Sequence, residues 1–202
     1  MRRLVLTFVI VLLSAGFVQA IENLSFGLGI NYLPTSKLEI GEFNHSEEST
    51  YDNVFYEGSL FLGLPANFRV GPYYSYYKKT VAPDTPSETD ASIWGIGVIS
   101  DYGYVLTKSG STEFVFGVES GYGQLSENNL YLSRSTGSVW IGGFGGLRFN
   151  LSPIYQLEID YMYRISNYDF TQYPHKRFEY TGSSLRLTLN YRFFMKTFKE
   201  ES

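Results

Sequence analysis

The stretch from Ser183 to Phe193 constrains the fold of this chain most, because apolar and polar residues alternate in it without a break. Its apolar parity ends in two aromatic rings and consists of Leu185, Leu187, Leu189, Tyr191 and Phe193. Its polar parity consists of Ser184, Arg186, Thr188, Asn190 and Arg192. Successive side chains of a strand point to opposite faces, whereas a helix with this pattern would have no apolar stripe. The stretch is therefore predicted to be a β-strand with one apolar and one polar face.

The same period of two recurs along the rest of the chain. With the first stretch included, the alternating segments are 24–32, 54–64, 68–77, 94–104, 114–123, 139–149, 156–164 and 183–193. Long polar stretches and short turns alternate between them, and Pro34 is expected to end the first strand. A tilted strand of roughly ten residues is long enough to cross a hydrocarbon core. The predicted fold is all-β, an eight-stranded antiparallel up-and-down transmembrane barrel with short turns at one end and longer loops at the other.

The first twenty residues have the features of a secretory signal peptide. Arg2 and Arg3 precede an apolar run from Leu4 to Val18, and Val18-Gln19-Ala20 fits a cleavage site with small residues. The apolar run is shorter than the roughly 20 residues that a membrane anchor needs. We predict a signal peptide at 1–20, a barrel at 21–194 and a short periplasmic tail at 195–202.

Composition limits the possible partners. Removal of Arg2 and Arg3 from the 16 basic residues leaves 14 against 20 acidic ones, a net charge of −6, which argues against a nucleic-acid partner. The chain has no cysteine, so we expect neither disulfides nor a lipid-modified cysteine after the signal. No cofactor and no metal site are predicted.

An apolar strand that closes on Tyr191 and Phe193 resembles the last strand of bacterial outer-membrane β-barrels, and the eight segments resemble the small OmpA/OmpX-type barrels from residue 21 to 193. The resemblance implies a location in the cell outer membrane of a Gram-negative bacterium, with periplasmic turns and extracellular loops. It also implies an assembly signal read by the barrel-assembly machinery, consisting of Leu185, Leu187, Leu189, Tyr191 and Phe193. The chain departs from the family in that residues 194–202 follow the closing aromatic.

Charged residues on the polar parity of the strands distinguish a membrane barrel from a soluble lipocalin-like barrel. Every lysine after the signal peptide lies in a loop or at a strand end. The strands instead carry balanced charges, which a closed lumen must pair: Glu57, Arg69, Asp101, Glu119, Arg148, Glu158, Asp160, Arg164, Arg186 and Arg192. Antiparallel pairing is expected to place Arg148 beside Glu158 and Asp160 beside Arg186. The sequence thus predicts a filled, ion-paired lumen.

Aromatic residues on the apolar parity gather near strand ends, as the interfacial girdles of membrane barrels do. The predicted outer girdle consists of Tyr32, Tyr74, Tyr76, Trp94, Tyr122, Tyr161 and Tyr163. The predicted periplasmic girdle consists of Phe68, Tyr102, Tyr104, Phe114 and Phe149, together with the last two residues of the assembly signal.

The function expected from these features is a structural or surface-interaction role through four extracellular loops, without enzymatic activity. The expected partners are outer-membrane lipid and lipopolysaccharide, and a monomer is expected. One alternative is a hydrophobic channel of the OmpW type, because several lumen positions are apolar: Phe55, Phe61, Tyr73, Phe144 and Met162. A second alternative is a lipid A-modifying enzyme that uses the loop histidines His45 and His175.

Overall fold

The computed structural model of the 202-residue chain describes residues 21–42, 45–81, 89–128, 133–170, 175–179 and 181–195. The predicted signal peptide and the tail beyond Met195 lie outside these residues. Within them the chain forms strands joined by turns, one of which is the 3₁₀ turn η1 (Pro65–Asn67). In the described part, no helix is long and apolar enough to cross a membrane.

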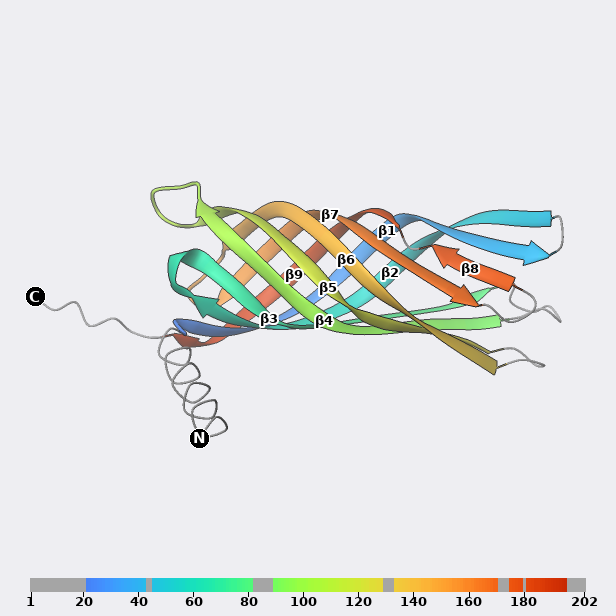
Figure 1. Ribbon diagram of the computed structural model, residues 1–202. Coiled ribbons are helices and arrows are strands. Elements are labelled where there is room, and N and C mark those ends of the chain that lie inside the picture. Colours follow the sequence, from blue (N-terminus) through green and yellow to red (C-terminus); the bar gives the residue numbers. More distant parts are fainter. Residues whose placement is uncertain are drawn as a thin grey trace, which may run out of the picture.

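Eight strands form a closed antiparallel barrel, which confirms the predicted fold class (Figure 1). The wall strands are β1 (Asn23–Glu42), β2 (His45–Leu64), β3 (Phe68–Val81), β4 (Thr89–Val105), β5 (Thr112–Asn128), β6 (Ser133–Asn150), β7 (Tyr155–Phe170) and β9 (Gly182–Met195). Each strand pairs with the next, and β9 closes the barrel by pairing with both β7 and β1. Asn23 is opposite both Gly63 and Met195, so the described chain begins and ends at the rim that carries the short turns.

The short strand β8 (His175–Glu179) extends the eighth wall position beyond the start of β9. It pairs with β1 and β7, the two strands that also flank β9. This segment falls in the stretch that the sequence indicated as the fourth long loop. The barrel wall is therefore taller at this point than the alternation predicted.

Several other strands are also longer than the roughly ten residues expected. β1 and β2 have 20 residues each and form one long hairpin. The prediction that Pro34 ends the first strand is wrong, because β1 continues to Glu42 after a shift in register between Leu33 and Ser36. Such an irregularity accommodates a proline, which has no N–H to give to the ladder. The extensions lie in polar sequence, where no apolar alternation marks a strand.

The short turns are built by local hydrogen bonds and unusual backbone angles. In η1, Ala66 and Asn67 adopt left-handed φ values of 63° and 60°. At the connection between β6 and β7, the Ser152 hydroxyl accepts hydrogen bonds from the backbone N–H groups of Ile154 and Tyr155 at 3.3 and 3.0 Å. A side chain that satisfies the backbone in this way favours a tight turn.

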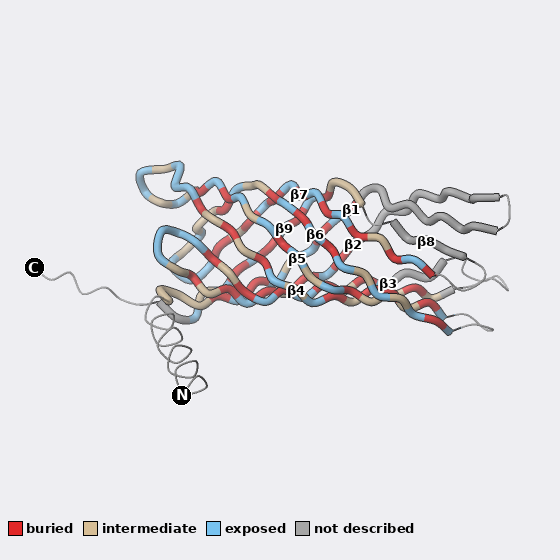
Figure 2. The backbone as a smooth tube through the Cα atoms, viewed as in Figure 1, coloured by how far each residue is buried: buried red, intermediate tan, exposed pale blue. Residues whose placement is uncertain are grey.

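Burial alternates residue by residue along the strands (Figure 2). The outward side chains are mostly large and apolar, so that Leu28 is 59% exposed and Val139 is 71% exposed. The inward side chains include charged residues such as Arg148 and Asp160, which are 2% and 0% exposed. Soluble proteins place these residue classes the other way round. Trp140 is buried beside the exposed Val139, so the even-numbered residues of β6 face the lumen.

Two apolar clusters fill the parts of the lumen that charged residues leave. The first lies in the middle of the barrel and consists of Phe61, Tyr73, Ile99, Val115, Trp140, Phe144 and Met162. The second lies toward the long hairpins and consists of Leu33, Phe55, Tyr77, Ala91, Ile93, Leu125, Tyr168 and Phe170. The interior is therefore packed with side chains, as expected for a barrel of eight strands.

Candidate functional site

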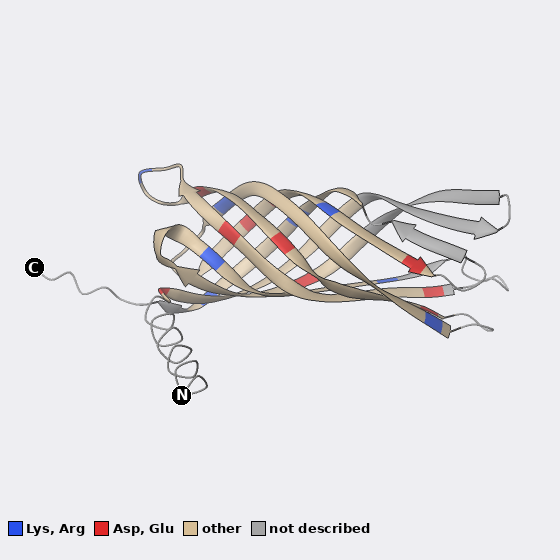
Figure 3. Cartoon of the chain, viewed as in Figure 1, with Lys and Arg blue, Asp and Glu red and all other residues tan. Residues whose placement is uncertain are grey.

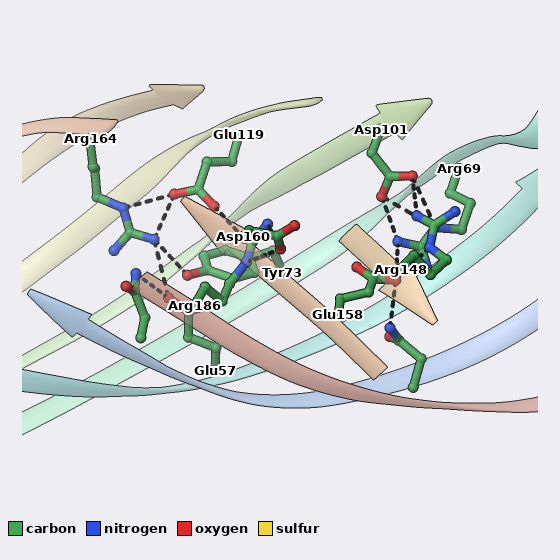
Figure 4. Close-up of polar contacts among 12 residues, drawn as sticks. Glu57, Arg69, Tyr73, Asp101, Glu119, Arg148, Glu158, Asp160, Arg164 and Arg186 are labelled. Carbon is green, nitrogen blue, oxygen red and sulfur yellow. Dashed lines mark hydrogen bonds and ion pairs between the residues drawn. The ribbon is translucent and has the colours of Figure 1, made fainter. Parts of the chain in front are cut away.

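The charged lumen residues form two clusters (Figure 4). The turn-side cluster consists of Arg69, Asp101, Glu113, Arg148 and Glu158. The hairpin-side cluster consists of Glu57, Tyr73, Glu119, Asp160, Arg164 and Arg186. All are buried, and Figure 3 shows basic and acidic positions interspersed along the wall strands.

Arg148 on β6 is the centre of the turn-side cluster. Its Nε lies 2.8 Å from Glu158, its Nη1 lies 2.8 Å from Glu113, and its Nη2 lies 2.7 Å from Asp101. Each of the three guanidinium nitrogens thus has a carboxylate partner. A buried guanidinium is stable when its donors are satisfied in this way.

Arg69 on β3 joins opposite walls of the barrel. Its Nη2 lies 2.7 Å from Asp101 on the adjacent strand β4 and 2.7 Å from Glu158 on β7, across the lumen. Asn190 on β9 donates a further hydrogen bond of 2.8 Å to Glu158. The predicted proximity of Arg148 and Glu158 is thus part of a wider network, in which Glu158 accepts from three side chains.

Arg164 on β7 is the centre of the hairpin-side cluster. Its Nη2 lies 2.6 Å from Glu119 on β5 and 3.3 Å from Glu57 on β2, and it donates to the Tyr73 hydroxyl on β3 at 2.6 Å. Asn31 on β1 donates to Glu57 at 3.0 Å. This arginine therefore reaches strands that are not its neighbours in the wall.

Arg186 on β9 connects the remaining carboxylates of the hairpin-side cluster. It lies 3.0 Å from Asp160, its cross-strand neighbour on β7, and 3.1 Å from Glu119. The predicted neighbours Asp160 and Arg186 are thus brought together. Glu158 and Asp160 are each paired with arginine, an arrangement that suits a structural role better than acid–base chemistry.

Aromatic rings cover the faces of the lumen arginines. The guanidinium carbon of Arg69 lies 4.1 Å from the centroid of Phe61, and that of Arg186 lies 4.2 Å from the centroid of Phe144. A cation over a ring face is attracted by the negative face of the ring, most strongly where water is excluded. Apolar lumen residues thus stabilise the ion pairs as well as filling space.

Glycines on the inward parity leave room for these large side chains. Arg164 has Gly142 and Gly182 as its cross-strand neighbours on β6 and β9. A Cβ on Gly121 would lie 2.5 Å from the Trp140 ring and 2.3 Å from the carbonyl oxygen of Ile96. The glycine-rich stretches of the sequence therefore serve packing.

Small enclosed spaces remain between the packed side chains. One lies between Glu57, Tyr73 and Arg186, and another lies between Phe55, Trp140 and Arg164. Each has a volume of about 10 Å³, which is close to the minimum for a single water molecule. Spaces of this size are far below what a passage for small molecules requires.

Some features of the lumen differ from the prediction or were missed. Arg192 is only half-buried, forms no ion pair with a described residue, and donates to Asn150 at 3.4 Å, because it lies where the lumen opens at the turn-side rim. The predicted network lacked Glu113, which lies at the start of β5, and the buried pair of Glu127 and Arg134 near the outer rim, 2.7 Å apart. In the register of β5 and β6, Glu113 is opposite Arg148 and Glu127 is opposite Arg134.

The predicted girdle and assembly-signal residues all lie on the outward parity of their strands. Leu185, Leu187 and Leu189 are exposed along β9, and Tyr191 stacks near Phe193 with ring centroids 6.4 Å apart. Their roles at the membrane interface and in assembly stay predictions.

The two histidines lie on strands that flank β1 at the long-hairpin end. His45 on β2 is opposite Glu42, and His175 on β8 is opposite Gly41. Their side chains lie outside the described part. Among the described residues, no group of three or more His, Asp or Glu side chains is arranged to hold a metal ion.

Comparison with solved structures shows similar barrels in three bacteria. Neisserial surface protein A (NspA) has a TM-score of 0.60 and 15% identity, over 84% of this chain and 97% of that chain. OprG from Pseudomonas aeruginosa has a TM-score of 0.58 and 8% identity, over 86% and 97%. Ail, the attachment invasion locus protein of Yersinia pestis, has a TM-score of 0.51 and 12% identity, over 86% and 100%. No protein-family profile and no curated protein sequence matches the chain.

At these identities the likeness concerns the fold. The chain is a closed eight-stranded antiparallel β-barrel with a buried and salt-bridged lumen, and its fold is similar to that of the outer-membrane barrels named above. Outer-membrane barrels of this fold have their short turns in the periplasm and their longer loops outside the cell.

Proposed function

We propose that this protein is a rigid outer-membrane anchor that presents its long hairpins for contacts at the cell surface, without conducting solutes and without catalysing a reaction. The observation that carries the proposal is the cross-linked lumen. Every wall strand contributes to it: Asn31 on β1, Glu57 on β2, Arg69 on β3, Asp101 on β4, Glu119 on β5, Arg148 on β6, Arg164 on β7 and Arg186 on β9. Such a network favours a single rigid wall over a pore.

The β1–β2 hairpin is the part of the barrel best placed for surface contacts. Its strands pair from Ser36 opposite Tyr51 to Glu42 opposite His45, beyond the predicted outer girdle (Figure 1). Its sequence is acidic, with Glu39, Glu42, Glu47 and Glu48. Carboxylates at this height suit contact with lipopolysaccharide through bridging divalent cations, because oxygen ligands are the ones that Ca²⁺ and Mg²⁺ prefer.

The names of two similar barrels agree with a role at the surface. One is called a surface protein and another an attachment invasion locus protein. The likeness supports the proposal through the shared fold alone, since fold does not determine function.

The test uses protein refolded in detergent with the four hairpin glutamates replaced by glutamine. Binding to lipopolysaccharide micelles is measured with Mg²⁺ and again after chelation. We expect wild-type binding to fall on chelation and the glutamine variant to bind weakly in both conditions. Equal, chelator-insensitive binding by both proteins would contradict this role of the hairpin.

Conductance in planar bilayers tests the other half of the proposal. The packed lumen predicts no steady single-channel openings from the wild-type protein. Steady openings would instead favour the hydrophobic channel alternative.

The enzyme alternative is tested by the lipid A composition of cells that express the wild-type, His45→Ala or His175→Ala protein. We expect the same composition in all of them, and a difference would favour the enzyme.

A further inference from the structure

The outer wall of the barrel has a groove of about 890 Å³ over β1 to β4. Its lining includes Leu28, Gly58, Leu60, Pro72, Ile96 and Val98. Its volume is within the range of small-molecule sites, roughly 300–1,000 Å³. Glu57, Ser59 and Tyr73 line both this groove and one of the small enclosed spaces of the lumen.

The groove lies where the ladder between β2 and β3 is interrupted. Ser59 pairs with Tyr73 and Leu62 pairs with Val70, but the two residue pairs between them are missing from the ladder. One of the missing positions is Pro72, which has no N–H to donate. Gly58 lies next to this break, and a Cβ added to it would have no atom within 4 Å. The missing side chain at Gly58 thus leaves a hollow in the outer face of the wall, beside the break.

The surface of the groove is almost entirely apolar. Leu28, Ile96 and Val98 are 59%, 56% and 53% exposed around it. Glu57 is the charged residue of the lining, and its carboxylate is turned into the lumen, where Asn31 and Arg164 hold it. No described charge faces the occupant, so the groove suits an apolar ligand.

The groove is continuous with the lipid-facing band of the barrel, so lipid acyl chains contact it. Apolar burial gives no driving force inside a bilayer, and association there depends on van der Waals packing. A concave wall offers a chain more such contacts than the convex wall elsewhere on a barrel. Tyr56 and Tyr74 line the groove, and Tyr74 belongs to the predicted outer girdle. If the predicted outer girdle lies at the outer interface, the end of the groove at Tyr74 faces the outer leaflet.

We propose that the groove holds one acyl chain of lipid A as a resident lipid. The chain lies along Gly58 and Pro72 and is flanked by Leu28 and Ile96. This site goes beyond the hairpin contacts proposed above, because it recognises the acyl chain through packing and does not use the hairpin carboxylates.

Gly58→Leu tests the site because the new side chain enters open space and fills the groove. Gly143→Leu is the matched control, since Gly143 also faces outward, on β6, with its nearest Cβ contact at 3.9 Å. Native mass spectrometry measures the one-to-one adduct of each folded protein with hexa-acylated lipid A, and with dipalmitoyl phosphatidylethanolamine for comparison. We expect Gly58→Leu to lower the lipid A adduct about tenfold and Gly143→Leu to leave it unchanged.

Several results would overturn the proposal. Equal adducts for both variants would remove the groove as the site. If Gly58→Leu selectively loses the phosphatidylethanolamine adduct, the occupant of the groove is that phospholipid. If it selectively loses a protein dimer, the occupant is a second copy of the chain. Ile96→Trp fills the same groove from an outward position and replaces Gly58→Leu if that variant fails to show heat-modifiable folding. The hairpin glutamine variant must keep the lipid A adduct, which separates this site from the hairpin role.

Discussion

The two charged clusters of the lumen pair their buried charges in different ways. In the turn-side cluster, Arg69 is opposite Asp101 and Arg148 is opposite both Glu113 and Glu158 in the strand register. In the hairpin-side cluster, Arg164 is opposite only glycines in the register and takes all its partners from non-adjacent strands. Cross-strand neighbours make most of the first cluster, to which Arg69 adds a contact with Glu158 across the lumen. In the second cluster Arg186 has a neighbour in Asp160, whereas Arg164 depends entirely on the closed barrel.

The two clusters therefore differ in the stage of folding at which their ion pairs can form. Neighbouring pairs can form as soon as a hairpin forms, whereas contacts across the lumen require the wall to close. We therefore expect the turn-side cluster to contribute more to the stability of individual hairpins and the hairpin-side cluster to report barrel closure. The variants below measure that contrast by urea unfolding in lipid vesicles.

The largest effect is expected for Arg148→Met. This change leaves Glu113 without its arginine and removes one partner each from Asp101 and Glu158. Breaking a buried ion pair by removing one partner costs about 3–5 kcal/mol of unfolding free energy. Arg192→Met is the control and should cost less than about 1 kcal/mol, since that residue is half-buried and forms no ion pair with a described residue. An equal loss of unfolding free energy in Arg148→Met and Arg192→Met would show that the turn-side cluster does not stabilise the barrel more than the exposed rim does.

A smaller loss is expected for Arg164→Met, about 2–3 kcal/mol, because the partners keep other donors. Glu119 retains Arg186 and Glu57 retains Asn31. Adding Glu119→Gln to this variant should be less than additive, because the two residues interact directly. Strict additivity would mean that the contact across the lumen contributes nothing.

A third contrast uses glycines beside the two clusters. A Cβ on Gly103 would lie 2.5 Å from Glu113 Oε2 and 2.9 Å from Arg148 Nη1, whereas a Cβ on Gly142 would come no closer than 3.1 Å to any atom. We expect Gly103→Ala to cost about 1–2 kcal/mol and Gly142→Ala to cost less than half of that. The reverse order would show that the hairpin-side cluster is the more tightly packed of the two.

The smallest effect is expected outside the lumen, for Lys78→Ala. Lys78 and Asp90 are 3.6 Å apart, and their side chains are 56% and 46% exposed. Exposed ion pairs contribute about 0.2–1 kcal/mol, so the unfolding midpoint should hardly move. A loss as large as that of Arg164→Met would contradict the distinction between lumen and surface pairs.

The sequence predicted the wall and the turn-side cluster well because both depend on local pattern. Alternation assigns each residue to a face, and a short turn such as that between β6 and β7 sets the register that places Arg148 beside Glu158. The partners of Arg164 could not be predicted in this way. Glu57 is 107 positions away in the chain, and only closure of the barrel brings it near.

Two other features were outside the reach of the pattern. The extension of β1 beyond Pro34 lies in polar sequence, where backbone pairing alone makes the strand. The wall groove depends on a gap in the ladder between β2 and β3 and on the open space beside Gly58, neither of which alternation encodes. Both are properties of strand pairing in three dimensions.

The most direct test of the account is the folding of the chain from residue 21 onward with and without detergent, followed by migration of boiled and unboiled samples. We expect β-rich circular dichroism and a heat-dependent shift in migration in detergent only, because the outward face of the barrel is apolar and the charges are inside. A soluble, folded monomer without detergent would contradict it, since the charged face would then have to face water.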